Sequence, residues 1–144
     1  MRVLVISQYY WPENFRINDL TEGLVERGHQ VTVLTGIPNY PSGSIFSDYA
    51  YEPKKYNNYN GVDIIRVPII PRGKSGFQLV LNYLSFVISS TIIGLYKLKK
   101  KNFDSIFVFE PSPVIVGLPA IAFRYFKKAP IIFWVLDLWP DTLE

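Results

Sequence analysis

The chain contains no cysteine and a single histidine, His29. Without cysteine it has no disulfide framework, no thiolate metal site and no cysteine nucleophile. One histidine also excludes a histidine-rich metal site. The sequence predicts no secretory leader, because Arg2 is followed at once by the short apolar run Val3–Ile6. We therefore expect a cytoplasmic protein that holds no metal.

Acidic residues are scarce in the middle of the chain. Residues 66–136 carry ten basic and two acidic side chains, whereas the whole chain of 144 residues has a net charge of only +3. Such a basic region suits nucleic acid, an anionic membrane surface or a phosphorylated substrate. Nucleic acid is the least suitable, because no known nucleic-acid motif is present and the basic residues flank apolar segments.

Continuous apolar runs predict five strands buried on both faces. They are Val3–Ile6, Val31–Leu34, Ile64–Val67, Ile106–Phe109 and Ile131–Val135. Apolar residues at helical spacing, from Ile17 to Val25, predict a helix between the first two strands, and Gly28 ends it. A long apolar helix is expected over 77–98.

A shorter helix is expected after Ser112 and Pro113, which suit its N-cap and first position. Pro119 is expected to kink this helix or delay its start. Alternating strands and helices predict an α/β fold, a Rossmann-like open parallel sheet with helices on both faces.

Ligands of such sheets bind in the crevice at the carboxyl ends of the strands. The chain segments expected there are 8–16, 35–43, 71–74, 110–112 and 137–141.

The first of these segments, Gln8–Arg16, contains no glycine. A dinucleotide-binding loop needs glycines there so that backbone can approach the pyrophosphate, and a P-loop is absent as well. We therefore exclude NAD and FAD at this position. Aromatic rings beside Glu13, Asn14 and Arg16 suit sugars, although Trp11 and Phe15 are equally suited to covering the core.

Residues 36–61 form a connection far longer than the usual two to six residues. It contains half of the tyrosines of the chain and four asparagines, which supply stacking and adaptable hydrogen bonds. Two interpretations remain open. The segment is either a functional loop or an edge hairpin that shields the sheet.

The predicted helix Phe77–Leu98 has no charged residue before Lys97 and is long enough to cross a bilayer. A spanning helix would separate two strands of one sheet, so two interpretations remain: a buried crossover helix, or a helix that rests on the bilayer interface. Basic residues before and after it are candidates for membrane contact. They are Arg72, Lys74, Lys97, Lys99, Lys100 and Lys101. Lysines at a helix C-terminus also complement its dipole.

Two carboxylates follow predicted strands in the crevice. Glu110 comes directly after the fourth strand, and Asp137 comes just after the fifth. Both are candidates for proton transfer or polar recognition. Asp141 has a simpler interpretation as a first-turn helix charge after Pro140.

The segments Gln8–Arg16 and Arg27–Thr35 resemble the opening of family 4 retaining glycosyltransferases. Pro38–Gly43, Gly61–Asp63 and Asp137–Asp141 resemble the branch that builds O-antigen, capsule and colanic acid, with L-fucosamine transferases most similar. The likeness extends over nearly the whole chain.

This resemblance implies the N-terminal, acceptor-binding domain of a GT-B fold. The acceptor, often a lipid-linked sugar, would contact Glu13, Asn14, Arg16, Asn39 and Tyr40, while Glu110 and Asp137 would line the reaction cleft as candidate catalytic residues. His29, at the opposite end of the sheet, is expected to be structural. No cofactor or metal is implied, since the nucleotide-sugar donor binds a C-terminal domain.

The resemblance also predicts an incomplete domain over 1–144, because the donor half is missing. An isolated chain of this kind would be inactive, with an exposed C-terminal sheet edge that favours marginal stability or homo-oligomers. The alternative is a non-catalytic membrane-docking subunit that recruits a separate donor-binding chain. A nucleotide-dependent oxidoreductase is disfavoured by the glycine-free first loop.

Overall fold

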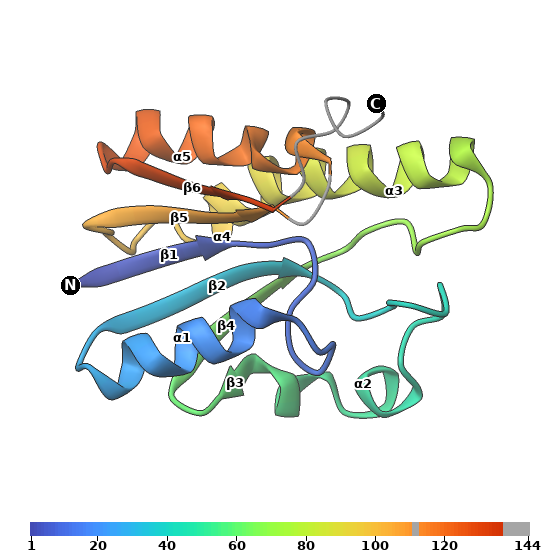
Figure 1. Cartoon of the computed structure of the whole chain (residues 1–144), viewed down its shortest axis with the longest axis horizontal. Helices are drawn as coiled ribbons and strands as arrows, with labels where there is room; N and C mark the ends of the chain where they lie inside the picture. Colours follow the sequence, from blue (N-terminus) through green and yellow to red (C-terminus); the bar gives the residue numbers. More distant parts are fainter. Residues whose placement is uncertain (111–112, 137–144) are drawn as a thin grey trace.

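The computed structural model describes residues 1–110 and 113–136, which form a six-stranded sheet in the order β3-β4-β2-β1-β5-β6 (Figure 1). The strands are β1 (Arg2–Ile6), β2 (Gln30–Gly36), β3 (Asn58–Tyr59), β4 (Val62–Val67), β5 (Ser105–Glu110) and β6 (Ile131–Val135). Neighbouring strands are parallel, apart from the antiparallel pair β3 and β4. The predicted α/β fold with a Rossmann-like open sheet is confirmed.

Helices cover both faces of this sheet, as predicted. Helix α1 (Arg16–Glu26) covers one face, where Ile17 packs with Val5, Val33 and Phe109. The other face is covered by α3 (Gly76–Ser89), α4 (Leu95–Lys97) and α5 (Leu118–Lys127). There Phe86 and Phe123 belong to a second buried cluster with Leu34 and Val108. The two clusters bury the two faces of the sheet.

The predicted helix over 77–98 is one continuous helical run that contains a π-helical turn, Ser90–Gly94, between α3 and α4. Ser75 begins it with a capping box, because its hydroxyl accepts from the backbone N–H of Gln78 while Gln78 Oε1 accepts from the N–H of Ser75. In the π turn, the hydroxyls of Ser90 and Thr91 donate to carbonyls of the preceding turn. The apolar pattern gave no indication of this turn.

The start of the last helix agrees with the prediction for Pro119. Ser112 lies outside the described residues, so its predicted N-cap role has no structural counterpart here. Pro113 precedes a 3₁₀ turn, Val114–Gly117, and α5 begins only at Leu118 with Pro119 in its first turn. The proline therefore delays the α-helix, since its ring permits only the first turn.

The long connection contains a small helix, α2 (Ser47–Tyr51), a 3₁₀ turn (Pro53–Asn57) and β3. Strand β3 turns through Asn60 and Gly61 into β4, so the edge hairpin is present. The Tyr59 ring of this hairpin stacks on Trp11, with ring centroids 4.5 Å apart. The connection thus covers the sheet edge and supports the loop that follows β1.

Gly43 provides a test of how tightly the connection is fixed against the chain before α3. Its φ is +75°, and a Cβ built on it would lie 2.0 Å from the backbone oxygen of Arg72. We expect Gly43→Ala to lower the free energy of unfolding, and to lower it by at least about 1 kcal/mol more than the control substitution Gly28→Ala does. Gly28 is a matched control, with φ +80° and no atom within 4 Å of that Cβ. Urea unfolding of both variants measures this, and equal losses would contradict the close approach.

Candidate functional site

The candidate site lies at the carboxyl edge of the sheet, where the loops after β1, β2 and β4 meet. In Figure 1 these loops lie at the arrowhead ends of the strands, on the side where α3 begins. Hydrogen bonds between the loops are made mainly by side chains to backbone groups. The arrangement therefore depends on a few buried polar residues.

Glu13 is the centre of this arrangement. Its side chain is only 3% exposed. One carboxylate oxygen accepts from the backbone N–H of Tyr10 at 3.2 Å, and the other accepts from those of Asn39 and Tyr40 at 2.8 and 2.7 Å. The carboxylate thereby joins the loop after β1 to the loop after β2. Burial raises the pKa of Glu13, and the three amide hydrogen bonds oppose that rise.

Arg66, on β4, supplies the compensating positive charge. It is 6% exposed and donates to the backbone oxygens of Gly36, at 2.9 Å, and of Trp11. Its guanidinium carbon lies 5.4 Å from the ring centroid of Tyr49. Burial lowers the pKa of Arg66 to about 10, and the nearby Glu13 opposes this shift, so the side chain stays charged at neutral pH.

A second buried network ties the same edge to helix α3. Asn82 Oδ1 accepts from Gln8 Nε2 at 2.7 Å and from the Tyr9 hydroxyl at 3.0 Å. Asn82 Nδ2 donates to the backbone oxygen of Ile70 at 2.6 Å. Burial raises the pKa of Tyr9 to about 12, which keeps the phenol neutral. Asn82 thus fixes the start of the β1 loop against the helix.

Three rings form an aromatic cluster at this edge: Tyr9, Phe15 and Tyr40. Tyr9 and Phe15 are stacked, with centroids 5.7 Å apart and planes 11° apart, and Tyr40 lies 5.2 Å from each. The Arg72 guanidinium carbon lies 5.6 Å from the Tyr40 centroid, and the Arg72 backbone N–H donates to Asn39 Oδ1 at 2.8 Å. Phe15 and Tyr40 are half-buried, so part of their surface faces solvent.

The residues predicted to bind an acceptor divide into two groups. Asn14 and Arg16 are exposed beside the aromatic cluster, and Tyr40 is part of it. Glu13 and Asn39 are buried, and their side chains bond to other parts of the protein. These two side chains therefore hold the loops, whereas Asn14, Arg16 and Tyr40 have surface that is accessible to a ligand.

Sequence reasoning missed Arg66 and Asn82. Each has a signal in hindsight, since Arg66 is the charged residue within the apolar run Ile64–Val67, and Asn82 lies in an apolar helix. A polar side chain inside an apolar segment is expected to find buried partners. The sequence could not identify those partners, because they belong to distant loops.

The two candidate catalytic carboxylates stay predictions. The backbone of Glu110 ends β5 at the carboxyl edge, where it pairs with Val135, but its side chain lies outside the described part. Asp137 and Asp141 also lie outside it.

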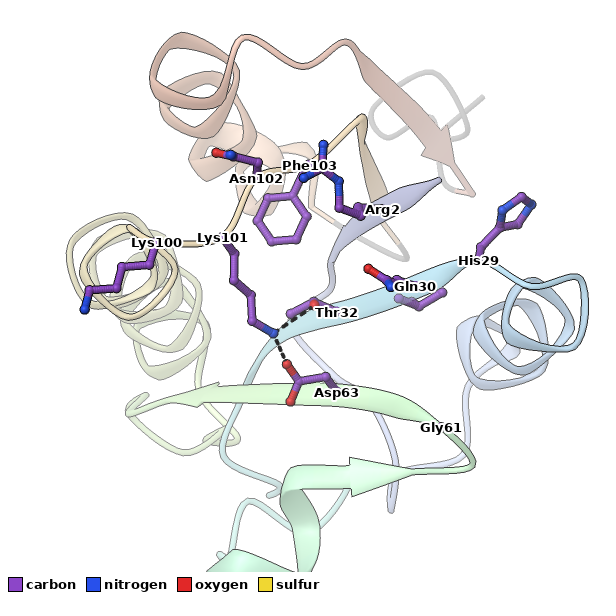
Figure 2. A pocket seen from close by; sticks show the side chains of 11 residues that line it. Arg2, His29, Gln30, Thr32, Gly61, Asp63, Lys100, Lys101, Asn102 and Phe103 are labelled. Carbon is purple, nitrogen blue, oxygen red and sulfur yellow. Dashed lines mark hydrogen bonds and ion pairs between the residues drawn. The ribbon is translucent and has the colours of Figure 1, made fainter.

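Three of the basic residues predicted to contact a membrane bond within the protein, and one of them is Arg72, whose guanidinium donates to the Tyr83 hydroxyl at 3.4 Å. Lys97 Nζ donates to the backbone oxygen of Arg66 at 2.8 Å, and Lys101 forms an ion pair with Asp63. Lys101 lies in a hollow of about 540 Å³ at the amino edge of the sheet, which Lys100 and His29 also line (Figure 2). His29 is thus at the opposite end from the crevice, as predicted. Arg72 belongs to the crevice, whereas Lys74 and Lys99 are exposed.

No protein-family model matches the chain, and no curated protein matches it either.

The pH dependence of stability tests the burial of Glu13. Its raised pKa means that the folded state keeps this proton to a higher pH than the unfolded chain, in which the ordinary value is 4.5. The contribution of Glu13 to stability is therefore largest below pH 4.5 and declines as the pH rises through the folded pKa. We expect wild type to lose stability relative to Glu13→Gln over that window, measured by urea unfolding. A relative gain with rising pH would show that the amides outweigh burial.

Proposed function

We propose that this chain is the acceptor-binding half of a retaining glycosyltransferase. The enzyme would transfer a sugar from a nucleotide-sugar donor to a lipid-linked glycan in bacterial surface polysaccharide synthesis. One observation carries the proposal: aromatic rings and a buried carboxylate occupy the loop after β1, where a Rossmann-type dinucleotide fold brings glycine backbone to a pyrophosphate.

The exposed chemistry of the site supports a carbohydrate ligand. Half-buried aromatic rings offer apolar faces to the C–H groups of a sugar, and Asn14 and Arg16 offer a polar amide and a guanidinium to its hydroxyls. Arg72, over the Tyr40 ring, adds a second cation to the same edge. Few, well-fixed polar groups around an apolar surface are typical of small-molecule sites.

The remaining parts of the mechanism follow from the resemblance to family 4 enzymes. In this proposal the nucleotide sugar binds a second domain, and Glu110 and Asp137 line the cleft between the two. The enzyme works at the inner face of the cytoplasmic membrane. The alternative, a non-catalytic docking subunit, keeps the membrane contact but does not require the crevice to bind a sugar.

Binding of methyl glycosides tests the proposed acceptor site. Their short aglycone avoids the apolar surfaces elsewhere on the protein, and a panel of common hexosides and N-acetylhexosaminides can be screened by saturation-transfer NMR. For a glycoside that binds, we expect Tyr40→Ala to weaken binding by about threefold to tenfold, because an aromatic face is lost. Arg16→Ala is expected to weaken it as well, because a guanidinium donor is lost.

Matched controls are available for both variants. Tyr51→Ala removes an exposed tyrosine of α2, and Arg27→Ala removes an exposed arginine at the other end of α1. Both are expected to bind glycosides as wild type does. Binding of NADH with no binding of any glycoside would overturn the proposal, as would equal losses in the test and control variants.

A further inference from the structure

The helical run from α3 to α4 is strongly apolar, yet only a small part of it is buried. Gly76–Lys97 spans 22 residues with a mean hydropathy of 1.7 over its most apolar stretch, and only 22% of that stretch is buried. By length and composition this run could cross a membrane. Its inner side packs on the sheet through Asn82, Phe86 and Ser90, however, and its two ends lead into β4 and β5 of that sheet. The run therefore lies against the domain.

The outer side of this run is an unbroken apolar stripe. Its members are large, exposed and spaced three or four residues apart, so they share one side of the helix. They are Phe77, Val80, Leu84, Ile88, Ile92 and Tyr96. Phe77 and Ile88 are 72% and 58% exposed, which is far more than a core stripe permits.

Helix α5 continues this apolar surface. It covers the same face of the sheet, beside α3, and both helices contribute to one buried cluster (Figure 1). Its exposed apolar residues are Leu118, Ile121, Tyr125 and Phe126. Together with the α3–α4 stripe they form what we call the two-helix apolar surface. The two sets of residues meet at the hollow that Tyr96 and Phe126 both line, and contiguous exposed apolar patches mark interaction sites.

The charged side chains that these two helices carry are all positive. Neither Gly76–Lys97 nor Leu118–Lys127 contains an aspartate or glutamate. Both helices end at the amino edge of the sheet, where Lys99, Lys100, Arg124 and Lys128 are exposed. Lys127 is not among the free cations, since its Nζ donates to three backbone oxygens around the end of α4. An apolar surface on two helices whose charged residues are all cations is complementary to an anionic lipid interface.

A hollow between the two helices lies at this cationic end. It has a volume of about 350 Å³ and is lined by Leu95, Tyr96, Lys99, Phe126 and Lys127. Lys99 Nζ lies 4.3 Å from the ring centroid of Tyr96. Apolar walls, aromatic rings and an exposed ammonium are together suited to an acyl chain and its phosphate headgroup.

We propose that the two-helix apolar surface docks on the interface of an anionic phospholipid bilayer, with α3–α4 and α5 lying in the plane of the membrane. The surface extends along α3 to Phe77, close in the chain to Arg72 of the crevice. Docking in this way would place the acceptor site beside the lipids. That the acceptor is itself lipid-linked rests on the proposed function. The docking itself needs no sugar.

Vesicle sedimentation tests the apolar part of this proposal. The probe is a vesicle of phosphatidylcholine and phosphatidylglycerol, with phosphatidylcholine alone as the neutral comparison. We expect wild type to bind the anionic vesicles, and Ile88→Ser with Ile92→Ser to bind at least about tenfold more weakly, since two apolar side chains no longer enter the interface. The matched control is Ile45→Ser with Ile132→Ser, which changes two exposed isoleucines elsewhere and should bind as wild type does.

The charged part needs a second pair of variants. Lys99→Gln with Lys100→Gln is expected to weaken binding to anionic vesicles about thirtyfold, because each lysine near an anionic surface contributes about 1 kcal/mol. Lys54→Gln with Lys55→Gln makes the same change in net charge on the long connection and should have little effect. High salt should weaken wild-type binding more than it weakens binding of the Lys99→Gln with Lys100→Gln variant, which keeps Arg124 and Lys128.

Several outcomes would overturn docking. They are wild type remaining in the supernatant with every vesicle, equal losses in test and control variants, and a dimer in analytical ultracentrifugation that Ile88→Ser with Ile92→Ser dissociates. The last result would assign the surface to a second copy of the chain. Failure of the acceptor site is detected separately, because methyl glycoside binding is measured without vesicles and the crevice variants leave the two helices unchanged.

Discussion

Burying the Glu13 carboxylate takes an ion out of water. The loops at the carboxyl edge of the sheet are arranged so that hydrogen bonds offset the free energy of this desolvation. Desolvation of an ion in a protein opposes folding by several kcal/mol unless polar partners replace the lost water. Here three backbone N–H groups from two loops supply those partners, and the charge of the buried Arg66 adds a weaker electrostatic stabilisation without a direct hydrogen bond. The loops after β1 and β2 are thus held in place by the need to satisfy one charge. The positions of Tyr40 and Phe15, and with them the aromatic cluster, follow from it.

Two surfaces of different chemistry lie on this one domain. The crevice combines half-buried rings with fixed polar groups, whereas the outer sides of α3–α4 and α5 carry large apolar residues without any acidic neighbour on either helix. A polar site requires exact partners, so it is built from buried hydrogen bonds. An apolar surface that meets lipid needs only exposed area and favourable charge. The sheet supplies a rigid support for both.

The strands and main helices could be predicted because each apolar run or period has a simple physical cause. Val3–Ile6 is buried on both faces of a parallel sheet, and a continuous apolar run is what such a position requires. The role of Glu13 could not be predicted, because two of its three partners are backbone amides of residues 26 and 27 positions away. Likewise, the partners of Lys97 and Lys101 are groups on β4 that only the folded chain brings near. The sequence shows which residues are basic, but only the tertiary structure shows which basic side chains are already bonded within the protein.

The π-helical turn Ser90–Gly94 has a geometric consequence for the helix that contains it. In a regular α-helix, residues four apart are offset by about 40° around the axis, so a stripe with this spacing winds slowly away from any flat partner. A π turn contains more residues per turn and recovers part of this offset. Ile88, Ile92 and Tyr96, which lie before, within and after the turn, therefore stay closer to one line along the helix. The wider turn straightens the row of side chains without straightening the helix, and the hydroxyls of Ser90 and Thr91 bond to carbonyls of the preceding helical turn.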